Sequence, residues 1–287
     1  MHATHTRRAL RASAAAAATL TASSALAQQA FYTPSGTQPG EGVWTLKPRV
    51  EYREYRYDPH GDYRSTREIV SSVEVGYGIS KDLAIYLDIP TIQRTAIRAA
   101  DGGRDHDFGL GDVSLLIKYR VLRLDTSPID TARFSILAGL ELPTGTAPLG
   151  SDSWDPTIGF AGTIIRGRHG VSLSSRLTFN TGTERPGDNT ADGPAEELKF
   201  DAAYLFRLAP ERYTRDTTGS WYLVGELNGL WMFGDGSGDA QIALSPGILY
   251  EGTTWALEVA VQIPVWQKMH RHPEMRFGVG VEVRFQF

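Results

Sequence analysis

The C-terminal segment, residues 275–287, alternates apolar and polar side chains over its whole length. Its odd positions are Met275, Phe277, Val279, Val281, Val283, Phe285 and Phe287, and its even positions are Arg276, Gly278, Gly280, Glu282, Arg284 and Gln286. Successive side chains of a β-strand point to opposite faces, so this pattern predicts a strand with one apolar face and one polar face. The sequence ends on Phe287, which belongs to the apolar face.

A strand that ends in this way resembles the C-terminal strand of a bacterial outer-membrane β-barrel. The resemblance implies that Phe285 and Phe287 form the signal that the barrel-insertion machinery reads, although Gly278 and Gly280 are not at the usual glycine position of such signals. The expected fold class is therefore all-β, a single antiparallel transmembrane barrel of the outer membrane. Outer-membrane lipid and the insertion machinery are the partners that follow from this expectation.

The composition of the chain is compatible with a membrane barrel. Hydrophobic residues make up 41% of 287 residues, and the mean hydropathy of −0.26 is that of an ordinary soluble protein. This is expected because only alternate residues of a barrel strand meet lipid. No run of about 18 apolar residues occurs, which argues against a spanning helix. The chain has no cysteine, so disulfides, thiolate metal sites and a lipoprotein anchor are excluded.

Residues 1–27 have the parts of a cleaved secretory signal peptide. Three arginines precede a weakly apolar Ala/Leu segment, and Ala25-Leu26-Ala27 has the small residues of a cleavage site, which would make Gln28 the first mature residue. The pair Arg7-Arg8 also fits a twin-arginine signal, although that route carries folded proteins. Cleavage removes three arginines and no acid from a chain of net charge −4, and the more acidic mature chain argues against nucleic acid as a partner.

Segments of about ten alternating residues, separated by turn-rich clusters, follow from residue 43 onward. Twelve strands are predicted, at residues 43–57, 67–79, 82–95, 111–122, 131–142, 154–165, 171–180, 196–208, 221–232, 240–250, 255–265 and 275–287. Residues 28–42 are expected to form a periplasmic N-terminal segment, and residues 43–287 the barrel. An even number of strands places both ends of the barrel on the periplasmic side.

The lengths of the connections and the tryptophans fit this scheme. Long outer loops are predicted at residues 58–66, 96–110, 143–153, 181–195, 233–239 and 266–274, and inner turns at 80–81, 123–130, 166–170, 209–220 and 251–254, of which 209–220 is long for its side. Aromatic residues collect at the two membrane interfaces. Trp44, Trp221 and Trp255 fall at predicted periplasmic ends, and Trp154, Trp231 and Trp266 at predicted outer ends. A soluble lipocalin-like barrel or sandwich is the alternative.

Twelve strands close into a cylinder roughly 24 Å across, and the inward side chains decide whether anything passes. The predicted lumen-lining residues carry both signs of charge; they are Arg49, Arg53, Glu74, Asp88, Lys118, Arg120, Arg133, Glu141, Arg176, Glu226, Glu258, Glu282 and Arg284. Such a set can pair across the lumen into a largely closed network. It can also line a narrow water channel without strong charge selectivity. The oligomeric state is left open.

Three strings carry a resemblance to one family: FGLGDVSLLIKYR at residues 108–120, LELPTGT at 140–146 and SPGILY at 245–250. They resemble the outer-membrane barrels grouped as transporters of the phenol-degradation meta-pathway, and the similarity covers most of the mature chain. The shared motifs are turns and strand starts. The resemblance therefore implies uptake of a small hydrophobic or aromatic organic solute, and it assigns no role to any single residue.

Two other classes of function compete with transport: a structural barrel without transport, and an outer-membrane lipid-modifying enzyme. Such an enzyme needs a Ser/His pair on the outer wall. The mature histidines His60, His106, His169, His270 and His272 all fall in predicted connections, and no Gly-x-Ser-x-Gly motif occurs. We therefore expect no enzyme and no cofactor.

The histidines raise one further candidate, a metal site. Pairing of the first and last strands would bring His60 towards His270 and His272, and imidazoles with nearby carboxylates are ligands for zinc or copper. A solvated pair of polar loops is the simpler interpretation.

Overall fold

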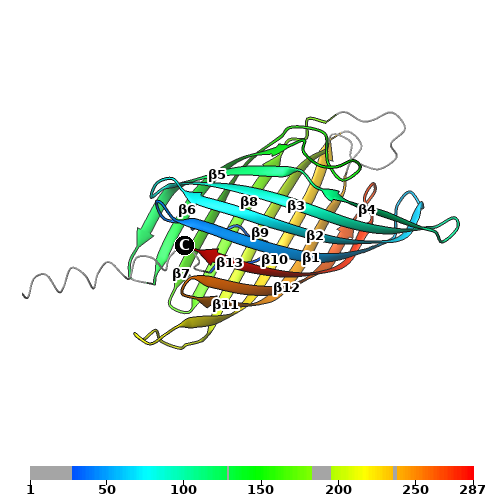
Figure 1. Cartoon of the computed structure of the whole chain (residues 1–287). Helices are drawn as coiled ribbons and strands as arrows, with labels where there is room; N and C mark the ends of the chain where they lie inside the picture. The colour runs from blue at the N-terminus through cyan, green and yellow to red at the C-terminus, as the bar shows by residue number, and fades with distance from the viewer. Residues whose placement is uncertain (1–27, 128, 183–194, 235–237) are drawn as a thin grey trace, which may run out of the picture.

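The computed structural model describes residues 28–127, 129–182, 195–234 and 238–287. Its strands form one closed antiparallel sheet, a β-barrel whose strands run obliquely around it (Figure 1). They are β1 (Trp44–Arg56), β2 (Tyr63–Gly78), β3 (Leu83–Arg98), β4 (Arg104–Leu110), β5 (Val113–Asp125), β6 (Thr131–Leu142), β7 (Asp155–Arg166), β8 (His169–Thr178), β9 (Ala195–Ala209), β10 (Gly219–Gly234), β11 (Ala240–Gly252), β12 (Trp255–Lys268) and β13 (Glu274–Gln286). Among the described residues, no helix is long and apolar enough to cross a bilayer.

The sheet closes through β1 and β3. β1 pairs with β2 on one side and with β13 on the other. From β13 the strands follow one another in descending order to β5, which pairs with β3. β3 also pairs with β2, and this pairing closes the barrel. Residues 83–88 of β3 pair with β5, whereas residues 91–97 pair with β4. β4 and β5 therefore follow one another in one position of the barrel. The thirteen strands thus fill twelve positions, which confirms the predicted twelve-stranded barrel.

We call the end of the barrel that holds the first residue of β1 and the last of β13 the inner end, and the opposite end the outer end. At the inner end the backbone of Trp44 exchanges two hydrogen bonds with that of Phe287, at N···O distances of 2.9 and 3.1 Å. Phe285 and Phe287 lie on the outside of the barrel and are exposed. Their role as an insertion signal stays a prediction.

Strand β4 corrects the prediction that residues 96–110 form an outer loop. In β4 the exposed side chains of Arg104, His106 and Phe108 alternate with the half-buried Asp105 and Asp107. Both faces are polar enough to hide the alternation in the sequence, as expected for a strand that extends past the lipid into water. The histidine assignment is corrected as well, because His106 lies within β4 and His169 begins β8.

The interruption between β4 and β5 anchors the loop between β6 and β7. Asp112, buried at this interruption, accepts hydrogen bonds from the backbone N–H groups of Thr144, Gly145 and Ser151, at 3.0, 2.7 and 2.5 Å. Two of the strings that carry the family resemblance, 108–120 and 140–146, therefore meet at one carboxylate. The residues by which these strings resemble the family therefore fix the conformation of a turn.

The outside of the barrel is apolar. Exposed aliphatic side chains follow the strands all the way round, among them Val50, Ile117, Leu173, Leu223 and Ile248. Such a surface is stable in hydrocarbon and unstable in water. The barrel therefore belongs in a membrane.

All six tryptophans are exposed and lie at or near strand ends, as predicted. Trp44 and Trp255 are the first residues of β1 and β12, and Trp221 lies near the start of β10. Tyr250 stands between Trp221 and Trp255, with ring centroids 4.9 and 5.0 Å away. These rings form part of an aromatic band at the inner end, the position that interfacial aromatic residues take.

Candidate functional site

The N-terminal segment lies inside the barrel, where the sequence analysis expected a periplasmic segment outside it. We call residues 28–39 the plug. Ala30, Phe31, Thr33, Ser35 and Gln38 are each at most 3% exposed. The plug pairs with no strand, so its backbone N–H and C=O groups depend on side chains of the barrel wall for hydrogen bonds.

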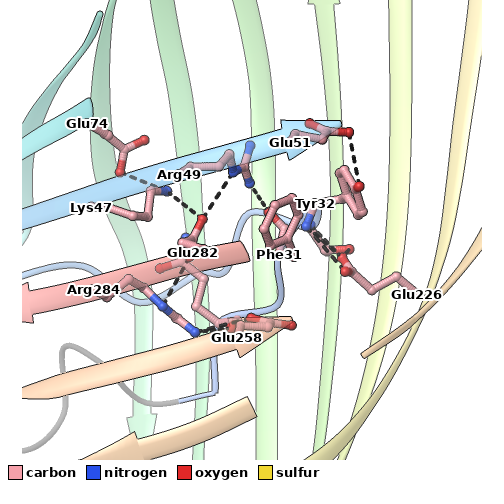
Figure 2. Close-up of polar contacts among 12 residues, drawn as sticks. Phe31, Tyr32, Lys47, Arg49, Glu51, Glu74, Glu226, Glu258, Glu282 and Arg284 are labelled. Carbon is pink, nitrogen blue, oxygen red and sulfur yellow. Dashed lines mark hydrogen bonds and ion pairs between the residues drawn. The ribbon is translucent and has the colours of Figure 1, made fainter. Parts of the chain in front are cut away.

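A carboxylate of β10 holds the middle of the plug. Glu226, which is 2% exposed, accepts hydrogen bonds from the backbone N–H groups of Tyr32 and Thr33, at 3.0 and 2.7 Å, and from the Thr33 hydroxyl at 2.7 Å. The Tyr32 hydroxyl donates to Glu51 of β1 at 3.0 Å. Figure 2 shows Glu226 and Glu51 on opposite sides of Tyr32. The plug is therefore tied to two distant parts of the wall at one residue.

Cations hold the plug carbonyls. Arg284 of β13 donates to the carbonyl of Gln29 at 2.8 Å, and Arg49 of β1 donates to the carbonyl of Phe31. The Arg49 guanidinium also lies over the Phe31 ring, 4.1 Å from its centroid, in cation–π contact. Lys118 of β5 donates to two further plug carbonyls, those of residues 35 and 37, at 2.7 and 3.0 Å.

Glycines let the plug lie directly on the wall. A Cβ atom at Gly280 of β13 would lie 2.2 Å from the Phe31 ring, so only glycine leaves room for that ring. A Cβ atom at Gly36 of the plug would lie 2.6 Å from the Arg133 carbonyl oxygen. Gly36 is also hydrogen-bonded on both sides, to Thr163 at 2.8 Å and from Ser135 at 3.1 Å. The inward glycine in the last strand thus serves the plug.

An ion-pair network backs the plug on one side of the lumen. Glu282 of β13 is its centre and lies 3.3 Å from Arg49, 3.2 Å from Arg284 and 4.0 Å from Lys47. Two more carboxylates pair with these cations. Glu74 lies 2.9 Å from Lys47, and Glu258 of β12 lies 3.3 Å from Arg284. Figure 2 shows this network beside Phe31. Because each cation that holds a plug carbonyl there is also paired with a buried carboxylate, its position is fixed before the plug binds.

The start of the plug has apolar surroundings. Ala30 packs in a buried cluster with Leu205, Val224, Leu249 and Ala256, all from the wall near the inner end. Charged side chains of the wall bind the later residues of the plug, whereas apolar packing holds Ala30. The plug is therefore held in the lumen by packing at its start and by polar contacts further along.

A cavity of about 1020 Å³ lies on the outer side of the plug. Phe31 and Tyr32 of the plug line it at one end, and His60 and His272 of the outer loops line it at the other. Tyr86 and Lys118 also line it, with the Lys118 ammonium 5.5 Å from the Tyr86 ring centroid. A solute that enters past the outer loops therefore meets the plug.

The residues predicted to line the lumen fall into three groups. Those that line the cavity are Arg49, Arg53, Glu74, Asp88, Lys118, Glu141 and Arg176. Those that lie buried at or beside the plug are Glu226, Glu258, Glu282 and Arg284. The guanidinium groups of Arg120 and Arg133 instead contact Asp82 and Asp125 near the turns of the inner end, although the backbone of Arg133 lies against Gly36 of the plug. Sequence reasoning missed the plug itself and its hydroxyl partners Ser135 and Thr163.

The outer-loop histidines are used differently from the metal site considered above. Asp239, before β11, accepts hydrogen bonds from the backbone N–H groups of His270, Arg271 and His272 and lies 2.7 Å from Nδ1 of His272. Burial alone would raise the pKa of Asp239, but these hydrogen bonds outweigh it and lower the pKa. Within the described ranges no group of three or more potential ligands is placed to hold a metal ion. Asp239 therefore anchors the loop.

Comparisons with known proteins agree with this architecture. The family described as "Putative MetA-pathway of phenol degradation" matches residues 82–268. An outer-membrane channel from Pseudomonas putida F1 is similar in structure, with a TM-score of 0.60 and 13% identity over 91% of this chain and 99% of that one. The β domain of the Bordetella autotransporter BrkA has a TM-score of 0.47 and 12% identity, over 86% of this chain and 100% of that one. No curated protein sequence matches the chain.

At 13% identity the channel from Pseudomonas putida F1 establishes the fold alone. The family match is stronger, since it spans more than half of the chain and includes all three strings that carried the resemblance. The closed barrel and its apolar outer face place the protein in the outer membrane. The chain belongs to the outer-membrane β-barrel family associated with the MetA pathway of phenol degradation.

Proposed function

We propose that the protein is an outer-membrane channel for small organic solutes, aromatic compounds among them, and that the plug controls passage. The observation that carries the proposal is the plug itself: it crosses a closed barrel beneath a cavity of about 1020 Å³ and is held by side chains alone. The ladders of the barrel do not include it. The plug can therefore shift without breaking the sheet.

The chemistry of the cavity supports aromatic solutes. Arg49 and Lys118 both lie near aromatic rings, at 4.1 Å from the Phe31 centroid and 5.5 Å from the Tyr86 centroid. A phenolic or benzoic ring offers the same π face to these cations, and its polar substituent has carboxylates and cations within the cavity as partners. A ring that replaces Phe31 over Arg49 would loosen the plug. The phenol-degradation family supports the same class of solute.

Transport rather than catalysis is proposed, and two parts of the sequence analysis enter as proposals. The signal peptide is removed after Ala27, and Phe285 and Phe287 guide insertion. Two histidine side chains have structural partners: His272 contacts Asp239 at 2.7 Å, and His106 contacts Thr95 at 3.1 Å.

The test is a comparison of the full protein with a chain that lacks residues 28–39 but keeps the signal peptide. In planar bilayers the shortened protein is expected to conduct more than the full protein, because its lumen is no longer filled. A deletion strain should grow slowly on a limiting aromatic carbon source, and the full gene should restore growth. Normal growth of the deletion strain, together with silent bilayers for both proteins, would favour a structural barrel.

A further inference from the structure

We infer that Glu251 is a binding site for the protein's own α-ammonium group at Gln28, so that removal of the signal peptide and seating of the plug are coupled. The inference rests on cleavage after Ala27, and it goes beyond the transport function. Hydrolysis of the bond between Ala27 and Gln28 consumes one water and leaves a carboxylate on Ala27 and an amine on Gln28. Near neutral pH this amine is largely protonated, because an α-amino group has a pKa of about 7.7–8.0.

The geometry of Gln28 fits a chain start inside the barrel. Gln28 is 3% exposed, and its backbone nitrogen lies 3.3 Å from Oε1 of Glu251 on β11. In a processed chain this nitrogen carries the positive charge. The contact then becomes an ammonium–carboxylate pair in place of an amide hydrogen bond, and charge-assisted hydrogen bonds are the stronger kind.

Glu251 has room for such a partner. In the described part of the chain Glu251 forms no ion pair with a lysine, arginine or histidine, although Arg284 is near enough to interact with it electrostatically and the Tyr222 side chain is hydrogen-bonded to it. The carboxylates nearer the middle of the lumen differ, since Glu282 contacts three cations and Glu226 accepts three hydrogen bonds. A carboxylate with no cation in direct contact, so close to the first mature residue, is the complement of a free amine.

The backbone of Gln28 gives independent support. Its φ angle is 53°, in the left-handed region that a glutamine adopts only at a cost. That angle is defined by the peptide bond to Ala27. Cleavage removes this bond, so the processed chain pays no such cost while its nitrogen stays beside Glu251.

The side chain of Gln28 lies against a glycine on the other side. A Cβ atom at Gly170, in β8, would lie 2.0 Å from Oε1 of Gln28. The side chain and the amine are thus directed to different strands, β8 and β11. An N-terminal glutamine cyclises when its amine attacks its own side-chain amide carbon and releases ammonia. With its amine and its side chain directed to different strands, Gln28 should keep its amine and its charge.

The experiment measures the reactivity of the α-amine in folded protein purified from outer membranes. Intact mass should show a chain that begins at uncyclised Gln28. A neutral amine acylates and an ammonium does not, so each unit by which Glu251 raises the pKa of the amine slows acylation about tenfold. Wild type should therefore be acylated at Gln28 at least about tenfold more slowly than Glu251→Gln. Gly170→Ala, which must displace the Gln28 side chain, should also react faster than wild type.

Two controls make the result specific. Glu274→Gln removes a carboxylate at the outer rim and should react at the wild-type rate. A mature chain refolded with one extra methionine before Gln28 has its amine displaced from Glu251, and it should react as fast as Glu251→Gln. Heat-modifiable migration on gels shows that each variant is folded. Equal rates for wild type and Glu251→Gln, a different first residue, or a mass lower by one ammonia would each overturn the inference. None of these readouts requires transport, so failure of the channel proposal would be seen separately.

Discussion

Truncation of Glu226 to alanine should release the plug while the barrel stays folded. The carboxylate accepts hydrogen bonds from three donors, namely the backbone N–H groups of Tyr32 and Thr33 and the Thr33 hydroxyl. Hydrogen bonds to a charged group contribute about 1.5–3 kcal/mol each, and water that enters the space left by the carboxylate restores part of this sum, so we expect the plugged state to lose about 3 kcal/mol. Each 1.4 kcal/mol is a factor of ten, so the unplugged fraction should rise roughly a hundredfold.

Single-channel recording in planar bilayers measures this fraction as the share of time spent in the high-conductance state. The chain that lacks residues 28–39 defines the conductance of that state. Glu226→Gln keeps the shape but loses the charge and should fall between wild type and Glu226→Ala. Glu54→Gln, a carboxylate that is paired with Arg276 away from the plug, should behave as wild type. The reasoning is refuted if Glu226→Ala is folded and shows the wild-type open fraction while the plug deletion conducts.

Three further changes test other parts of the structure. Gly280→Ala places a Cβ 2.2 Å from the Phe31 ring and should raise the open fraction in the same recordings, whereas Gly225→Ala, whose Cβ meets nothing within 4 Å, should leave it unchanged. Arg120→Ala removes the 3.0 Å contact with Asp82 at the inner end and should lower the unfolding temperature without a change in conductance. The pKa of Asp239 is lowered in the folded protein. The contribution of Asp239 to anchoring the outer loop is therefore fully present at pH values above the ordinary aspartate pKa of about 3.9, and it is lost as the pH falls through the lowered pKa. Pepsin should therefore cut the 269–273 loop of the wild type increasingly as the pH falls in that range. In Asp239→Asn, which lacks the carboxylate that titrates, the rate of cutting should depend less on pH.

The barrel could be predicted because its signal is local and repeated. Each strand carries its own alternation, as in residues 275–287, and the lipid demands that every outward position be apolar. The aromatic ends add a second signal at Trp44 and Trp255. Strand β4 was missed because it leaves the lipid, where that requirement no longer applies and the outward-facing Arg104 and His106 are tolerated. The pattern thus reports where a strand meets lipid more reliably than where it ends.

The plug could not be predicted in the same way, because its contacts are neither local nor periodic. Phe31 touches Arg49 and faces Gly280, positions far apart in the sequence that meet only after β1 and β13 have closed the barrel. The segment from residue 31 to residue 40 contains glycine, proline and threonine and shows no alternation of apolar and polar residues. Such a composition is typical of a linker. The two aromatic residues at its start are the one feature that a solvated linker would not need.

The inward-facing charged residues show which structural information would have been needed to predict the plug. Lys47 and Glu74 are register partners on neighbouring strands, and such a pair neutralises itself. Glu226 instead stands between Ala203 and Ser245 in the register, with no cation beside it. A buried carboxylate without a cation needs several N–H or O–H donors, and a closed barrel wall has already used its own backbone donors in the ladders. The donors must then come from something inside the lumen, and among the described residues the longest segment outside the strands at that end is the one that precedes β1. A register map, had it been known, would therefore have indicated the plug from Glu226 alone.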